Sequence, residues 1–75
     1  MDPQTIEATL KSYLVGVRVR LDKAAAIARA AEACALSGNV QTGVEISHEI
    51  EQLLYEVTTF LNAASMFRRL AQEEE

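Results

Sequence analysis

The chain has 75 residues and a formal net charge of −4, with 49% hydrophobic and 5% aromatic residues. This length allows one small domain with a limited core, and the single cysteine, Cys34, has no intrachain disulfide partner. The acidic balance argues against bulk attraction to nucleic acid or anionic membranes, and no apolar run approaches the roughly 20 residues that span a bilayer.

A first helix is predicted from about residue 3 to residue 37. Asp2 can accept hydrogen bonds from the free N–H groups at a helix start, and Pro3 suits the first helical position. Apolar residues recur at three- and four-residue steps, which is typical of one face of an amphipathic helix. They are Ile6, Leu10, Tyr13, Leu14, Val17, Leu21, Ala24, Ala28, Ala31 and Ala35.

A turn is predicted over residues 38–42. The run Ser-Gly-Asn at 37–39 is the strongest turn signal in the chain, and Gly43 follows it closely. A glycine at position 38 suits the left-handed conformation that ends many helices. The next helix has two candidate N-caps, Asn39 and Thr42, and the sequence does not choose between them.

A second helix is predicted from about residue 43 to residue 72, followed by a frayed, solvated acidic tail at 73–75. Its apolar stripe consists of Ile46, Ile50, Leu53, Leu54, Val57, Phe60, Leu61, Ala64, Phe67 and Ala71. Two long helices joined by a short turn predict an all-α, coiled-coil-like antiparallel hairpin. Residues 1–75 are therefore expected to form a single helical-hairpin domain.

A second apolar row lies on the far side of the first helix, where a hairpin partner does not reach. Exposed apolar rows often mark association sites, although alanine is also simply the best helix former. Helix propensity does not explain the β-branched members, and a mid-helix glycine suits close approach by a neighbouring helix. We therefore predict an intermolecular face formed by Val15, Gly16, Val19, Ala26, Ala30 and Ala33. Two hairpins would then dimerise into a four-helix bundle with the first helices at its centre.

No residue pattern indicates an active site. The spacing Glu45-x-x-His48 matches the Glu-x-x-His step of di-iron bundles, but the helical phase places His48 opposite the apolar stripe and favours a surface histidine. Cys34 has no base on its own face of the hairpin, and the glycines match no phosphate-binding motif. We expect no catalytic residues, no metal, no cofactor and no enzymatic activity.

Basic residues share one flank of the first helix. Lys11, Arg18 and Arg29 lie there with Asp22 among them, which favours a solvated edge of ion pairs over a nucleic-acid footprint. The layout of two long helices joined at a Ser-Gly-Asn turn resembles, in outline, plasmid copy-number RNA modulators that dimerise into four-helix bundles. It also resembles small helical co-chaperones of type III secretion needles.

These patterns predict a small cytoplasmic protein–protein interaction module, an adaptor, regulator or chaperone-like protein, acting as a homodimer of hairpins. One alternative is a subunit of a heteromeric helical complex such as a secretion-type co-chaperone. Another is an RNA-binding four-helix-bundle regulator. The cytoplasmic expectation rests on the lone free cysteine and on a start, Met1-Asp2-Pro3-Gln4, without a basic or apolar leader. No membrane partner is expected.

Overall fold

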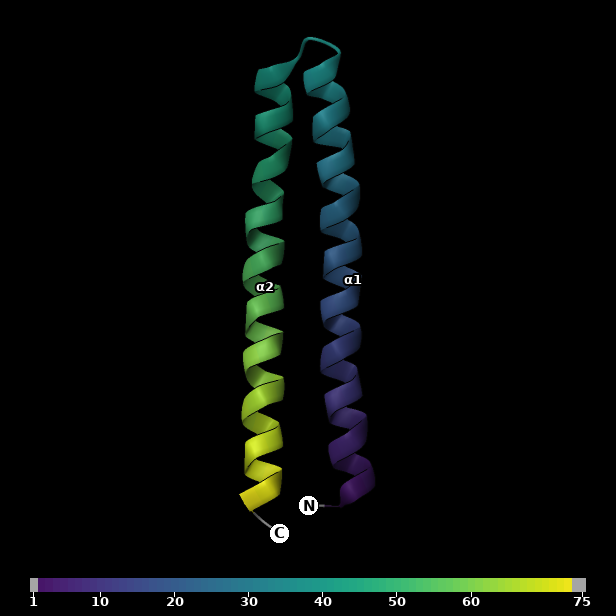
Figure 1. Ribbon diagram of the computed structural model, residues 1–75, viewed down its shortest axis with the longest axis vertical. Coiled ribbons are helices and arrows are strands. Elements are labelled where there is room, and N and C mark those ends of the chain that lie inside the picture. The colour runs from purple at the N-terminus through teal and green to yellow at the C-terminus, as the bar shows by residue number, and fades with distance from the viewer. Residues whose placement is uncertain (1, 74–75) are drawn as a thin grey trace.

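The computed structural model describes residues 2–73, and within them the chain forms two helices and no strand. Helix α1 spans Pro3–Leu36 and helix α2 spans Val40–Glu73, each with 34 residues. The helices lie side by side and antiparallel, with a tight loop at one end and both termini at the other (Figure 1). The result is a rod whose Cα extents are 58 × 15 × 10 Å. The predicted all-α hairpin is confirmed.

The start of α1 is capped as its sequence predicts. Asp2 has extended backbone angles, and its Oδ2 accepts hydrogen bonds from the Thr5 N–H and from the Thr5 hydroxyl, both at 3.3 Å. Pro3 follows at the first helical position, where its missing N–H costs nothing. These contacts fix where the helix begins.

The end of α1 forms a Schellman motif. Gly38 has a φ of 99°, in the left-handed region that favours glycine. Its N–H donates to the Ala35 carbonyl at 3.1 Å, and the Asn39 N–H donates to the Cys34 carbonyl at 2.9 Å. These two bonds satisfy carbonyls that would otherwise lack partners, so the chain reverses direction within a few residues.

Helix α2 begins at Val40, earlier than the predicted residue 43, so the turn is shorter than the predicted 38–42. The Asn39 carbonyl accepts the first α2 hydrogen bond from the Gly43 N–H at 3.0 Å, which gives Asn39 rather than Thr42 the N-cap position. Gly43 is buried against α1, and a Cβ added there would lie 2.6 Å from the Ala31 carbonyl oxygen. Gly43 therefore reflects a close helix approach and not a turn.

The predicted acidic tail falls partly outside the described residues. Glu73 is the last residue of α2 and is helical, contrary to its assignment to a frayed end. Glu74 and Glu75 lie outside the described part of the chain. Within that part, neither helix contains a stretch that is both long enough and apolar enough to span a membrane.

The contact between the helices is narrow. Ala24, Leu53 and Val57 are the buried apolar residues of the core, and no described side chain is completely enclosed. The aromatic pair Tyr13 and Phe60 adds a tilted contact with ring centroids 6.0 Å apart. A pair of helices with so thin a core has little apolar burial to oppose the entropy lost on folding.

The apolar stripes are wider than the contact that covers them. Five stripe residues that were expected inside are exposed: Leu14, Leu21, Ala28, Leu54 and Leu61. A single neighbouring helix covers only part of such a stripe, since stripes of this width suit helices with more than one neighbour. Part of each predicted apolar stripe therefore stays exposed in the isolated hairpin.

Candidate interaction surfaces

The register of the two helices is fixed by contacts near their middle. Gly16 lies opposite Phe60, where an added Cβ would come within 3.2 Å of the ring. One turn further along α1, the Arg20 Nε donates to the Glu56 Oε1 at 2.9 Å. The Arg20 guanidinium also lies over the Phe60 ring, 4.4 Å from its centroid. These contacts set which residues of α1 and α2 share a level.

By this register Leu14 lies level with Leu61, and Leu21 lies level with Leu54. Leu14, Leu54 and Leu61 each directly follow an inward-facing residue. Leu21 follows Arg20, whose backbone occupies an inward position while its side chain reaches Glu56. The two leucines on each helix are seven residues apart. In an antiparallel helix pair, residues that follow inward positions turn toward the same side on both helices. Together the four leucines form an apolar surface along one side of the rod, which we name the leucine flank. Their exposed fractions are 57%, 44%, 47% and 45% in chain order.

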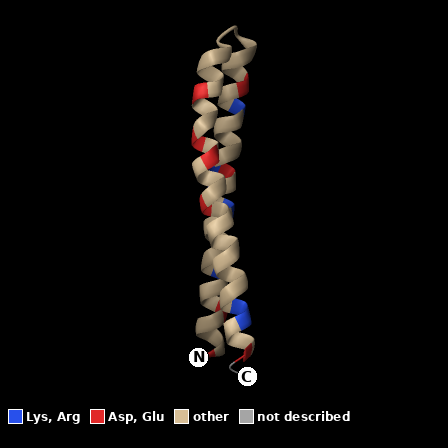
Figure 2. Cartoon of the chain, turned by 90° about the vertical axis from the view of Figure 1, so that its left-hand side faces the viewer, with Lys and Arg blue, Asp and Glu red and all other residues tan. Residues whose placement is uncertain are grey.

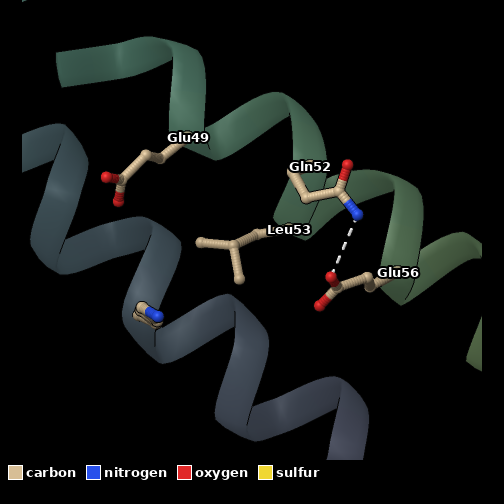
Figure 3. Close-up of a pocket in the computed structure, with 5 residues that line it drawn as sticks. Glu49, Gln52, Leu53 and Glu56 are labelled. Carbon is tan, nitrogen blue, oxygen red and sulfur yellow. Dashed lines mark hydrogen bonds between the residues drawn. The ribbon is translucent and has the colours of Figure 1, made fainter.

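The opposite side of the rod carries polar side chains near its middle. Residues that precede inward positions turn toward it, and there they line a shallow groove of about 320 Å³ (Figure 3). The lining residues are Lys23, Glu49, Gln52, Leu53 and Glu56. We name the surface formed by these five residues and Arg20 the polar flank. The hairpin thus has two flanks of opposite character.

Glu56 accepts hydrogen bonds from two side chains of the polar flank. Gln52 Nε2 donates to its Oε2 at 3.1 Å, while Arg20 donates to its other oxygen (Figure 3 shows the Gln52 bond). Both donors favour the ionised carboxylate, so the Gln52 and Arg20 hydrogen bonds lower the pKa of Glu56 below its ordinary value of 4.5. With about a third of each side chain exposed, the Arg20–Glu56 pair serves mainly to fix the register.

The face predicted for intermolecular contact lies on α1 alone. Its members Val15, Val19, Ala26, Ala30 and Ala33 are all exposed in the hairpin. Gly16 is separated from them, because it is half-buried and faces the Phe60 ring of α2. The close helix approach expected at Gly16 is therefore between α1 and α2 of the same chain. Whether the far face meets another molecule stays a prediction.

The residues weighed for catalysis or metal binding are dispersed. Glu45 and His48 are exposed, and Cys34 is a half-buried free thiol on the other helix. Across residues 2–73, no three His, Cys, Asp or Glu side chains are grouped as metal ligands would be.

The basic edge of α1 contains ion pairs within the same helix. Lys11 Nζ lies 3.2 Å from Glu7 Oε1, and Arg18 donates to Asp22 Oδ2 at 2.9 Å. All four side chains are well exposed, so each pair contributes little to stability. The pairs partly neutralise the positive charge that phosphate binding needs.

Sequence reasoning missed the leucine flank as a surface of its own. The signal was present in the seven-residue spacing of the leucines and in the width of the two stripes. It could be recognised only with the register, which shows that the uncovered parts of both stripes fall on one side of the rod.

No family model matches the chain, and neither a curated protein nor a solved structure matches it.

Proposed function

We propose that this chain is a small protein–protein interaction module that acts as a homodimer of hairpins, two of which form a four-helix bundle. Its activity is binding and not catalysis. The observation that carries the proposal is the large area that one hairpin leaves exposed. The chain exposes 5583 Å², whereas a compact monomer of this mass is expected to expose about 4,500 Å².

The excess of about 1,000 Å² is comparable to what one partner contributes to a standard interface, about 800 Å². Folding into the hairpin buries only about half of the surface of the extended chain, while even a 60-residue compact domain buries about 60%. The exposed area includes large apolar residues spread along both helices, among them Leu14, Val44, Leu54 and Met66. A second hairpin would supply the burial that one hairpin lacks.

The shape of the molecule also supports binding of another protein. The described surface offers long apolar faces and a shallow, open groove, whereas small-molecule sites are concave and enclose most of the ligand. We further propose that the protein works in a reducing compartment, the cytoplasm, which is consistent with its free and half-buried Cys34.

The absolute mass of the chain in solution tests the proposal directly. Sedimentation equilibrium over a range of concentrations should give twice the chain mass of 8.2 kDa. A mass of one chain throughout that range would contradict the proposal. The apolar faces would then be left for a different helical protein, as in a heteromeric complex, and a pull-down with the folded hairpin would be the next step.

A further inference from the structure

We propose that the leucine flank is the surface on which a second copy of this chain packs, while the polar flank and the far face of α1 remain in contact with solvent. The assignment rests on the proposed function, since it names the surface through which the hairpin self-associates. It differs from the face predicted from the sequence, which lies on the far side of α1.

The two candidate faces differ in how much apolar area they offer. The far face of α1 contains two valines, Val15 and Val19, among alanines, and an alanine side chain contributes little on burial. The leucine flank offers four leucines, each about half exposed. Large aliphatic side chains at an interface core exclude more water for each residue buried. The apolar area therefore favours the leucine flank.

The leucine flank is also built by both helices. Leu14 and Leu61 lie at one level and Leu21 and Leu54 at the next, so a second hairpin laid on this side would contact α1 and α2 together. In a four-helix bundle each helix buries a stripe against two neighbours. A second neighbouring helix would cover the exposed part of each apolar stripe. A second hairpin packed on the far face of α1 would leave the exposed part of the α2 stripe uncovered.

Charge distribution excludes the opposite side of the rod. The polar flank holds Lys23, Glu49 and the Arg20–Glu56 pair, and removing them from water would carry a desolvation penalty. By contrast, α2 has no charged residue between Glu56 and Arg68 (Figure 2 shows this uncharged stretch of α2, with the charged residues at this level lying on α1). Of the two flanks, the leucine flank is thus the one that can be covered at low electrostatic cost.

Charge complementarity favours a second copy as the occupant. Basic residues outnumber acidic ones in α1, whereas acidic residues outnumber basic ones in α2. When two hairpins pack through the leucine flank with their loops at the same end, α1 of each copy lies across from α2 of the other. The register also places Glu7 at the level of Arg68, so each Glu7 would face the partner's Arg68. Opposite charges then meet along the edges of the bundle.

A matched pair of variants tests this assignment by sedimentation equilibrium. Leu21 and Val19 lie on the same helix with exposed fractions of 44% and 46%. We expect Leu21→Glu to lower the mass twofold, to that of one chain, and Val19→Glu to leave it unchanged. If the wild type is dimeric and Leu21→Glu remains dimeric, the assignment is wrong while self-association stands. A wild type that is monomeric throughout contradicts self-association itself, and this assignment with it.

A second measurement covers the case in which Leu21→Glu does not fold, as judged by loss of its helical circular dichroism. In a Cys34→Ser background, Leu61→Cys and Val19→Cys each introduce one thiol on one of the two faces. At concentrations where the mass is that of a dimer, alkylation of the thiol from Leu61→Cys should be at least about tenfold slower than after dilution to monomer. The thiol from Val19→Cys should react equally fast in both. The reverse pattern, or no protection at either position, would overturn the assignment.

Discussion

Replacing Gly43 with alanine should destabilise the hairpin, although alanine is the better helix former. A Cβ at this position would lie 2.6 Å from the Ala31 carbonyl oxygen, whereas carbon and carbonyl oxygen in close helix contacts are about 3.3 Å apart or more. Both neighbouring groups are backbone, so no side chain can rotate away and the helices must separate. Overpacking of this kind costs about 1–3 kcal/mol, and the gain in helix propensity is at most about 1 kcal/mol. We expect a net loss of about 1–2 kcal/mol.

Gly16 provides the matched control for this substitution. An added Cβ there would meet the edge of the Phe60 ring at 3.2 Å, and a half-buried ring can tilt by the few tenths of an ångström required. The position lies in the middle of α1, where exchange of glycine for alanine gains about 1 kcal/mol. Gly16→Ala should therefore be between neutral and about 1 kcal/mol more stable than the wild type.

Thermal unfolding followed by far-ultraviolet circular dichroism measures both effects at equal chain concentration. The two variants should differ by about 2 kcal/mol, which for a chain of this size corresponds to about 8–16 °C in Tm. The reasoning would be refuted if Gly43→Ala melted at or above the temperature of Gly16→Ala. Such a result would mean that α2 lies further from Ala31 in solution than the structure indicates.

Three further predictions address the loop, the ion pair and the orientation of the dimer. Gly38→Ala should lower the free energy of unfolding by about 1–2 kcal/mol because the φ of 99° is left-handed, and Gly38→Asn should lower it by less. Urea unfolding measures both variants. Equal stability of the wild type and both variants would contradict the backbone argument. Hydrogen bonds keep the pKa of Glu56 below 4.5, so its contribution to stability is complete above pH 4.5 and is lost as the pH falls through its folded-state pKa. Between pH 7 and pH 3, urea unfolding of Glu56→Gln should consequently vary less with pH than that of the wild type; identical profiles would exclude this role. In a Cys34→Ser background, spin labels on Gln41→Cys should be much closer together in the dimer than the 58 Å length of the hairpin, whereas a separation near that length would place the loops at opposite ends.

The helix ends that the sequence predicted well are those with local chemical causes. Asp2 and Pro3 cap the start of α1, and Gly38 takes the left-handed position after its end. The predicted start of the second helix, about residue 43, came three residues late, because a glycine close to a turn suits both a loop and a close helix contact. Only the position of Ala31 on the opposite helix distinguishes the two uses, and that position depends on tertiary packing.

The candidate surface was harder to predict for a related reason. Periodicity shows which residues lie on the apolar side of a helix, but not how many neighbouring helices cover that side. Periodicity therefore assigned Leu14 and Leu21 to the stripe that faces the other helix, and it left the far face of α1 as the uncovered apolar surface. The register fixed by Arg20 and Glu56 shows instead that the unused part of each stripe lies on one side of the rod.

The energetic margin explains why one substitution in the leucine flank should be decisive. Each half-exposed leucine would contribute about 1 kcal/mol on full burial, so the leucines of two chains together contribute about 8 kcal/mol. The loss of translational and rotational freedom on association costs about 4–15 kcal/mol, which is of the same order. The net free energy of association is therefore small, and the other contacts of the interface supply it. Leu21→Glu removes a leucine from each copy and also buries two unpaired carboxylates, at several kcal/mol each. This small net free energy cannot absorb both losses, whereas a glutamate on the solvent-facing side of α1 incurs neither.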